Sequence, residues 1–274
     1  MDQPNSKPTH FLLELIQNAD DNTYPKDVKP ALSLTLKTKH KLTITCNEIG
    51  FSKRNVSAIC DFGETTKTVE DGTKGFIGEK GIGFKSVFRV ANIVSISSGP
   101  FQFSLDRRQI LGMVTPIISE EQKINTGTYM NLDLKSQVDY DNIQKDIGEI
   151  KPEILIFLRK ISQLTISTPS RHEKINAVRG ILKSVGFLGE MIRLEVTSTL
   201  SSASTSEMEY IISRHTMTGL PEEELRPGVE QSEIVLAFPV APDTNPILKS
   251  QYTYAYLPID EFGFSVISPS SFFQ

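Results

Sequence analysis

The sequence has 274 residues, enough for one large domain or two ordinary ones with a substantial core. Its 38% hydrophobic and 23% charged residues are typical of a soluble globular protein. The net charge of −4 argues against a surface dedicated to nucleic acid, because phosphate binding needs clustered lysine and arginine. The sequence has no apolar run of membrane-spanning length and no signal peptide at its start. Cys46 and Cys60 lack metal-binding spacing, so we expect reduced thiols in an intracellular protein, cytoplasmic or nuclear.

A helix is predicted over residues 10–22, near the start of the chain. Four apolar residues recur with helical spacing and share one face: Leu12, Leu15, Ile16 and Ala19. Glu14, Asn18 and Asp21 form a polar stripe on the opposite face. Such a stripe is either the solvated side of an amphipathic helix or the wall of a cleft.

Two strands are predicted next, at residues 31–37 and 42–46. The second strand is followed directly by Asn47 and Glu48, and then by Gly50. These residues could form a plain capped turn, or they could present an amide or carboxylate oxygen as an acceptor for a ligand. Both interpretations remain open from the residues alone.

Ser52 is predicted to be the N-cap of a short helix through Ile59. Residues 61–77 combine glycine, threonine and charge without a clear period. This composition predicts a mobile loop that connects the short helix to the next motif.

Three glycines with the spacing G-x-x-G-x-G, at positions 78, 81 and 83, lead into an apolar periodic segment that ends at Ala91. A glycine loop that opens a helix exposes backbone N–H groups beside the positive end of the helix dipole, which suits a phosphate. The spacing is neither that of a dinucleotide fingerprint nor that of a Walker A loop. A simple glycine-rich turn is the alternative.

The remaining elements of the first part are strands at 92–98, 100–105, 112–118 and 127–135, a helix at 139–160 divided or kinked by Pro152, and a strand at 161–167. We place a domain boundary near residue 168. Beyond it, a helix is predicted at 173–183 and strands at 191–199, 208–215, 234–239 and 253–258.

In this order, the motifs resemble the ATP-binding domain of the gyrase, heat-shock chaperone, histidine kinase and MutL superfamily, called GHKL. The amino-acid sequences of residues 14–22, 47–51 and 77–86 most resemble the branch of plant NO VEIN-like proteins and, more distantly, sacsin. The resemblance covers roughly residues 8–168. It implies an α+β chain: a GHKL (Bergerat) two-layer α/β sandwich with a mixed sheet at 1–168, and a transducer-like α+β segment, which could be incomplete, at 169–274. The early start of the first helix suggests a fragment or an unusually short member.

By this resemblance, Glu14 would be the catalytic base that activates water, Asn18 would ligate magnesium, and Asp21 would support Asn18 or a metal-bound water. The remaining cofactor-binding residues would be Asn47, Glu48, Gly50, Lys67, Gly78, Lys80, Gly81, Ile82, Gly83, Phe84 and Thr128. The family uses an aspartate after the second strand to accept from the adenine amino group. That aspartate is missing here, so Asn47 or Glu48 would have to supply the acceptor.

The resemblance implies Mg²⁺ and ATP as cofactors and slow ATP hydrolysis coupled to conformational change or chaperone-like action, with a homodimer or a client protein as partner. One alternative is a nucleotide-responsive interaction module without turnover. Another is a magnesium-dependent enzyme that acts on a different diphosphate, in which Asp20, Asp21 and Asn22 would ligate the metal directly.

Overall fold

In the computed structural model of the chain, the residues that can be described divide into two compact units. They are residues 10–37, 40–60, 82–118, 124, 126–184, 187–200, 202–219, 231–241, 245–247, 252–255, 257–261 and 268–269. Unit 1 comprises residues 1–149, 159–174 and 198–202, and unit 2 comprises residues 150–158, 175–197 and 203–274. The units are interleaved along the chain. The domain boundary that we placed near residue 168 remains a prediction.

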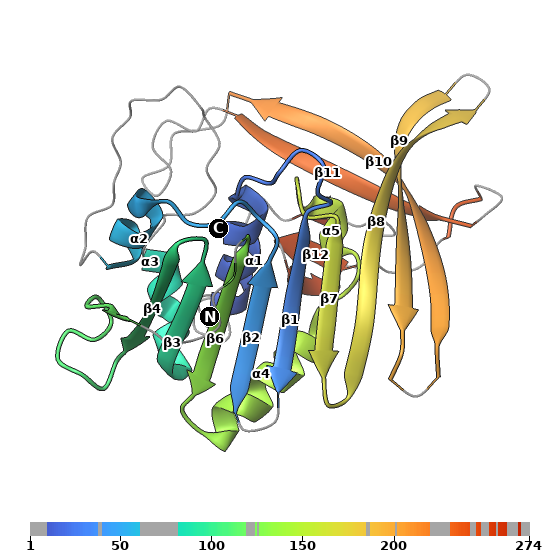
Figure 1. Cartoon of the computed structure of the whole chain (residues 1–274). Coiled ribbons are helices and arrows are strands. Elements are labelled where there is room, and N and C mark those ends of the chain that lie inside the picture. The colour runs from blue at the N-terminus through green and yellow to red at the C-terminus, as the bar shows by residue number, and fades with distance from the viewer. Residues whose placement is uncertain are drawn as a thin grey trace. The chain divides into compact units, whose positions relative to one another are not determined.

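Unit 1 is built on a mixed sheet (Figure 1). Its strands, in hydrogen-bonded order, are β7 (Gln163–Thr168), β1 (Ala31–Lys37), β2 (Lys41–Cys46), β6 (Thr128–Leu134), β3 (Ala91–Ser98), β4 (Phe101–Asp106) and β5 (Ile117–Ile118). β1 and β2 form an antiparallel hairpin in which Leu34 lies opposite Ile44. β7 pairs with the other edge of β1 in parallel, with Ile166 opposite Leu34.

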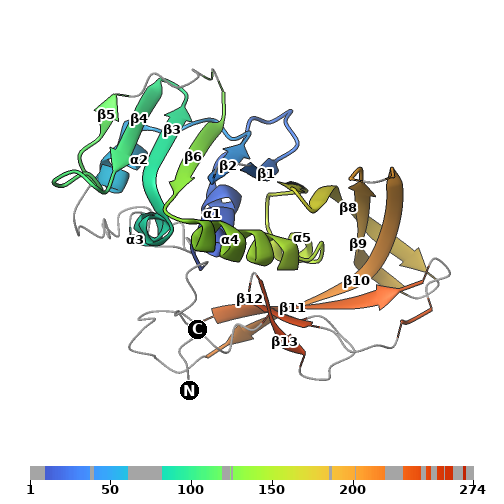
Figure 2. The same ribbon diagram turned by 90° about the horizontal axis from the view of Figure 1, so that it is seen from below.

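Helices cover one face of this sheet. They are α1 (His10–Asp21), α2 (Lys53–Cys60), α3 (Ile82–Lys85), the 3₁₀ helix η2 (Ser86–Arg89) and α4 (Gln137–Glu149). Figure 2 shows α1, α3 and α4 on the same side of the strands. The apolar face predicted for α1 is confirmed, since Leu12, Leu15, Ile16 and Ala19 are all buried.

The two faces of the sheet differ in polarity because successive side chains of a strand point to opposite sides. β1 and β6 alternate strictly, with Leu34 and Leu132 fully buried on the side of the helices. The opposite face carries hydrogen-bonded polar pairs: Thr43 Oγ1 lies 2.7 Å from Asn131 Oδ1. The hydrophobic core of unit 1 therefore lies between the sheet and the helices.

Unit 2 contains long strands and little helix. Its elements include α5 (Ile154–Phe157), β9 (Phe187–Ser198), β10 (Ser204–Thr218), β11 (Gln231–Val240), and a small sheet of β12 (Tyr252–Ala255), β13 (Leu257–Glu261) and β14 (Ser268–Pro269). β8 (Arg171–Ser184) contributes residues to both units. Arg214 of β10 lies 2.9 Å from Glu190 of β9 and 3.3 Å from Glu233 of β11, so charges of opposite sign alternate across these strands.

The expected fold class, an α+β chain on a two-layer α/β sandwich, is wrong. Within the described residues, eleven strands form one mixed sheet in the order β11-β10-β9-β8-β7-β1-β2-β6-β3-β4-β5, and the chain is mostly β. The physical reason is that the second part of the chain, from β8 to β11, forms long strands instead of mixing helices with strands.

The error is largest at residues 173–183, where we predicted a helix and the structure has β8. Lys174, Ala177 and Lys183 favour a helix by intrinsic propensity. However, Ile175 and Ala177 are buried while Lys174 and Val178 are exposed, which is the period of a strand. Strand pairing overrides propensity here. The strand predicted at 112–118 is also mostly wrong, because only Ile117 and Ile118 are in β5.

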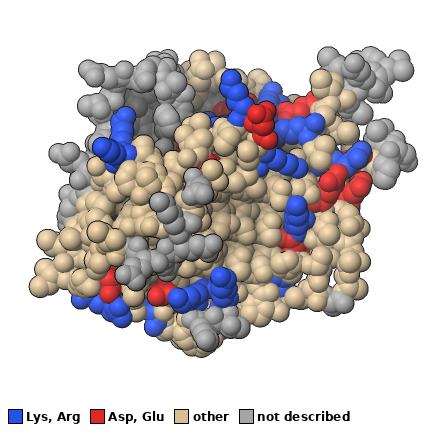
Figure 3. All heavy atoms as spheres, viewed as in Figure 1, with Lys and Arg blue, Asp and Glu red and all other residues tan. Residues whose placement is uncertain are grey.

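None of the helices in the described part of the chain is long and apolar enough to cross a membrane. On the face drawn in Figure 3, acidic and basic side chains lie close to each other in small mixed groups. This mixture agrees with the small net charge of −4.

Candidate functional site

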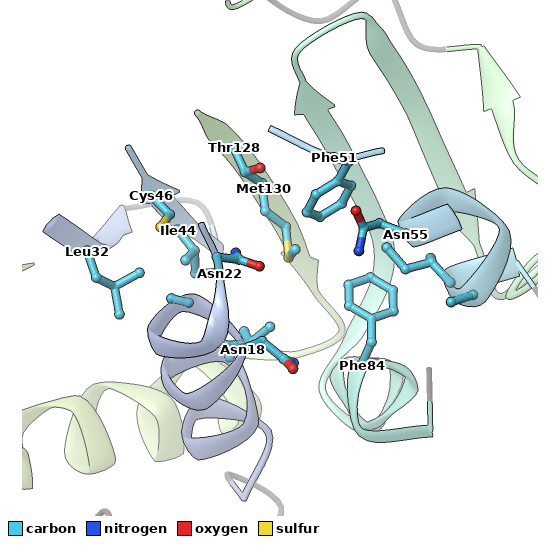
Figure 4. Close-up of a pocket in the computed structure, with 14 residues that line it drawn as sticks. Asn18, Asn22, Leu32, Ile44, Cys46, Phe51, Asn55, Phe84, Thr128 and Met130 are labelled. Atoms are coloured by element: carbon cyan, nitrogen blue, oxygen red, sulfur yellow. The ribbon is translucent and has the colours of Figure 1, made fainter. Parts of the chain in front are cut away.

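A pocket lies in unit 1 between α1, α2, α3 and the helix-covered face of the sheet (Figure 4). Its volume is about 100 Å³, several times the 10–15 Å³ that one buried water needs at minimum. The lining residues are Leu15, Asn18, Ala19, Asn22, Leu32, Ile44, Cys46, Phe51, Asn55, Ala58, Ile59, Phe84, Thr128 and Met130. They are mostly apolar with a few polar groups, which is typical of small-molecule sites.

One wall of the pocket is α1, which brings Asn18 and Asn22 to it. Figure 4 shows both asparagines at the pocket side of the helix. Glu14 lies one turn before Asn18, and residues four apart share a helix face. Of the three residues of the predicted polar stripe, Asn18 is the one that lines the pocket. The roles of Glu14 and Asn18 remain predictions.

The C-terminal end of α1 is fixed by Asp20, which is buried. Its carboxylate accepts hydrogen bonds from the backbone N–H groups of Arg159, Lys160 and Ile161, at 2.8, 2.8 and 2.9 Å. Lys160 Nζ in turn donates to the backbone oxygen of Asn22 at 2.7 Å. These contacts lock the helix against the segment that enters β7. Both Asp20 oxygens are thus engaged in holding backbone.

Asp21 takes part in the same attachment, since its Oδ1 lies 3.6 Å from Arg159 Nη2. The sequence predicted that Asp21 supports Asn18 or a metal-bound water. The structure places it beside a cation at the end of the helix. Among the described residues, no group of three or more histidine, cysteine, aspartate or glutamate side chains could hold a metal ion.

In the turn after β2, Asn47 and Glu48 make different contacts, although the sequence offered either of them as the acceptor. Asn47 Oδ1 accepts from the backbone N–H of Ala31, and its Nδ2 donates to the backbone oxygen of Lys29, both at 2.8 Å. Asn47 therefore joins the start of β1 to the end of β2. Glu48 is almost fully buried and is the residue that reaches Thr128.

Glu48 stands at the end of a hydrogen-bond chain behind the pocket. Thr128 donates its hydroxyl proton to Glu48 Oε1, and Ser98 Oγ lies 2.5 Å from Thr128 Oγ1. Glu48 Oε2 accepts from the backbone N–H of Gly50 at 2.7 Å. Ser98 Oγ also accepts from the backbone N–H of Phe51 at 2.7 Å. The network joins β6, β3 and the turn after β2.

The strand register explains why these residues meet. Thr128 lies opposite Cys46 of β2 and opposite Ser98 of β3, so the three residues form a row across three neighbouring strands. Gly50 has a positive φ of 93°, which favours glycine, and this turn directs its N–H to Glu48. Glu48, Gly50 and Thr128 therefore meet in one place, and their roles in cofactor binding remain predictions.

Cys46 lines the pocket as a protonated thiol. Burial raises the pKa of this thiol to about 11. Tyr24 donates its hydroxyl proton to the backbone oxygen of Ala19 at 2.7 Å, so the Cys46 thiol, 3.0 Å away, donates to the Tyr24 oxygen. Burial also raises the pKa of Tyr24 well above its usual range. Both groups are neutral at physiological pH.

The described pocket lining contains no acidic or basic side chain. Its polar groups are three asparagines, one thiol and one hydroxyl. Among the described residues, the side-chain amides of Asn18 and Asn22 have no hydrogen-bond partner, and the amide nitrogen of Asn55 has none either. Unpaired amides in a mostly apolar pocket are groups that a ligand could satisfy.

The glycine motif is only partly described. Phe84, in α3, lines the pocket, and the backbone of Ile82 and Gly83 begins the same helix. The other predicted phosphate-binding residues, Lys67, Gly78, Lys80 and Gly81, lie outside the described residues. Their roles remain predictions.

Sequence reasoning missed Ser98, Asn55 and Cys46 as site residues, and it considered Asn22 only as a direct metal ligand. Ser98 had a signal, because a serine at the end of the apolar strand 92–98 interrupts its inward face. Asn55 also had a signal in the sequence. It stands three residues after the N-cap Ser52, and a side chain at that position can hydrogen-bond back to the backbone of the cap residue. Neither signal specifies a pocket without the register of the sheet.

Unit 1 is therefore a mixed sheet with helices on one face and, between the sheet and the helices, a pocket whose described lining carries no charged side chain. No family model matches the chain. Part of the chain is similar to the protein NO VEIN of Arabidopsis thaliana, with 34% identity over 178 residues. The match covers 57% of this chain and 6% of that protein, so it relates the chain to a small part of a much longer relative.

Proposed function

We propose that this chain binds ATP with Mg²⁺ at a site of the GHKL type and hydrolyses it slowly. The main support is the pocket, whose described lining is neutral, apolar and supplied with unpaired amides. Such a lining suits a neutral heterocyclic base better than it suits phosphates. The base would occupy this pocket, and the phosphates would lie towards the glycine motif.

In this proposal, the Thr128 hydroxyl oxygen would recognise the base by accepting a hydrogen bond from it. Its hydroxyl proton is directed to Glu48, and it therefore receives the Ser98 hydroxyl proton. A hydroxyl oxygen has two lone pairs, so one remains for a donor from the pocket. Hydrogen-bond chains polarise their members, so the Glu48 carboxylate makes this oxygen a stronger acceptor. The amino group of adenine is a donor of the required kind.

The catalytic part rests on α1. Asn18 would ligate Mg²⁺ with its amide oxygen, together with phosphate and water oxygens, which are the ligands that magnesium prefers. Glu14, one turn away, would accept the proton of the attacking water. Gly78, Gly81 and Gly83 would present backbone N–H groups to the phosphates. Movement on nucleotide turnover would be coupled to a partner or client protein.

The contacts of Asp20 and Asp21 favour this proposal over the alternative in which Asp20, Asp21 and Asn22 ligate a metal directly. Both Asp20 oxygens hold backbone N–H groups, and Asp21 lies beside Arg159. A metal at Asp20 would have to displace three backbone hydrogen bonds. Asn18, by contrast, lines the pocket with its amide unpaired among the described residues.

The test is calorimetric titration of the chain with a non-hydrolysable ATP analogue and Mg²⁺. We expect saturable binding that is lost in Asn18→Ala, while Asn142→Ala, on the exposed side of α4, binds like the wild type. No binding at millimolar ligand by folded protein would contradict the ATP assignment.

Hydrolysis separates an ATPase from an interaction module that only responds to nucleotide. We expect Glu14→Gln to retain analogue binding and to lose phosphate release, because it keeps the side-chain shape and removes the base. Equal phosphate release by Glu14→Gln and the wild type would remove Glu14 from this role. Binding without release by the wild type would favour the interaction module.

A further inference from the structure

Asn55 is held in one orientation by the residue that caps its helix. Asn55 Oδ1 accepts hydrogen bonds from the backbone N–H and the hydroxyl group of Ser52, at 2.9 and 2.6 Å. Ser52 Oγ in turn accepts from the backbone N–H of Asn55 at 3.2 Å. This reciprocal arrangement has the logic of a capping box, with the oxygen of the amide committed to the cap.

The polarity of the Asn55 amide follows from these contacts. The oxygen and nitrogen of an amide are distinguished by their hydrogen bonds, and two donors from Ser52 require the oxygen on their side. The nitrogen is thus the polar atom left for the pocket that Asn55 lines. In Figure 4 the nitrogen is drawn on the side of Phe84 and the oxygen on the side of Phe51.

Asn55 differs in this respect from the two asparagines of α1. Among the described residues, no hydrogen bond fixes the amides of Asn18 and Asn22, so each could present its oxygen or its nitrogen. Asn55 presents only its two N–H donors. The pocket therefore has one donor of fixed identity at Asn55 and one acceptor of fixed identity at Thr128.

We propose that Asn55 is a specificity-determining residue of the pocket, whose Nδ2 donates a hydrogen bond to a ring nitrogen of a bound heteroaromatic base. The inference rests on the proposed nucleotide site. Thr128 selects a donor and Asn55 selects an acceptor, and the adenine ring offers both, with an amino group and unprotonated ring nitrogens. The rings of Phe51 and Phe84, which also line the pocket, suit a planar aromatic ligand.

Asn55→Asp is the sharpest variant for this idea. Aspartate retains an oxygen that can accept from Ser52, so the cap and the fold are preserved, but it replaces the donor with an acceptor. Adenosine is the probe, because it carries no phosphate charge that the new carboxylate could repel. Ser57→Asp, on the exposed side of α2, adds the same charge to the same helix and serves as the matched control.

We expect Asn55→Asp to bind adenosine at least about tenfold more weakly than the wild type, at an unchanged melting temperature. Ser57→Asp should bind like the wild type. Adenosine affinities within twofold in Asn55→Asp and the wild type would overturn the proposal. An absence of adenosine and ATP-analogue binding by the wild type would instead contradict the nucleotide site itself.

Analogues of adenosine in which one ring nitrogen is replaced by C–H identify the acceptor. The 1-deaza, 3-deaza and 7-deaza compounds are titrated into the wild type and Asn55→Asp, as a double-mutant cycle. We expect one analogue to bind the wild type more weakly and to show no further loss in Asn55→Asp. Equal losses on Asn55→Asp for adenosine and all three analogues would exclude a ring nitrogen as the partner.

Discussion

Asp20 Oδ1 accepts a hydrogen bond from the buried backbone N–H of Ile161, a residue 141 positions later in the chain. The same carboxylate also receives the N–H groups of Arg159 and Lys160. Asp20→Ala would leave three backbone donors without their acceptor, so we expect a loss of about 3 kcal/mol or more in the free energy of unfolding. Urea denaturation of the wild type and Asp20→Ala measures this difference in the free energy of unfolding. Asp27→Ala, at an exposed position, should change stability by less than about 0.5 kcal/mol. Equal effects of the two variants would contradict the anchoring role.

Thr128→Val tests the network behind the pocket. Valine has the shape of threonine but leaves the buried Glu48 Oε1 without its hydroxyl donor and Ser98 without its acceptor. We expect a loss of about 1–3 kcal/mol in the free energy of unfolding and weaker binding of the ATP analogue. Thr128→Ser retains the hydroxyl and should keep most of the affinity. Calorimetric binding that is the same in the valine and serine variants would remove Thr128 from base recognition.

Two glycine substitutions should act in opposite directions. Gly127 has a φ of 82°, and a Cβ there would lie 2.5 Å from the backbone oxygen of Cys46, so Gly127→Ala should destabilise the protein. Gly148 is in α4, and a Cβ there would meet nothing within 4 Å. Gly148→Ala should therefore raise stability by up to about 1 kcal/mol. The melting temperatures of both variants test these expectations. A higher melting temperature of Gly127→Ala would contradict the positive φ and the close approach to Cys46 at this position.

Cys46 should react slowly with iodoacetamide. With a pKa of about 11, roughly 0.1% of its thiol is ionised at pH 8, and the thiolate is the reactive form. In a Cys60→Ala background, mass spectrometry should show little labelling of the folded chain at pH 8. Labelling in urea should reach the rate of an ordinary thiol. A fast reaction in the folded state would contradict the burial of Cys46, its raised pKa, or both.

Glu190 should make the stability of unit 2 sensitive to acid. The hydrogen bond from Arg214, aided by Arg179, lowers the pKa of this carboxyl below its ordinary value of 4.5. Its contribution is fully present above that value and is lost as the pH falls through the lower pKa of the folded state. Below about pH 4.5, the unfolding midpoint of the wild type should fall more steeply than that of Glu190→Gln. Glu207→Gln, at the more exposed Arg193 contact, should follow the wild type.

Much of unit 1 was predictable because its elements have clear periods. The predictions of a helix at 10–22 and of strands at 31–37 and 42–46 are confirmed within about one residue. Ser52 caps α2 as predicted. Helical and strand periods are local properties, so a single sequence contains them.

The partners of individual polar residues were not predictable, because they depend on chain segments far away in the sequence. Asp20 and Asp21 are neighbours of the same type, yet only the approach of residues 159–161 makes Asp20 an anchor. Asn47 and Glu48 were equivalent candidates in the sequence. In the structure, the backbone N–H of Ala31 donates to the amide oxygen of Asn47, and the Thr128 hydroxyl donates to the carboxylate of Glu48. The fold-class prediction was wrong for a similar reason. β8 is a strand because it pairs with its neighbours in the sheet, and the residue types of β8 do not by themselves indicate that pairing.

The pairing of β1 with β7 also determines the order in which unit 1 can assemble during synthesis. β2 begins at Lys41, shortly after β1 ends at Lys37, so this hairpin can form as soon as both strands leave the ribosome. The other edge of β1 waits for β7, because Leu34 pairs with Ile166, 132 residues later. At roughly 5–20 residues per second, this edge stays open for about 7–26 s. An unpaired strand edge with apolar side chains can pair with another chain, so we expect the nascent chain to be most exposed to aggregation during that interval.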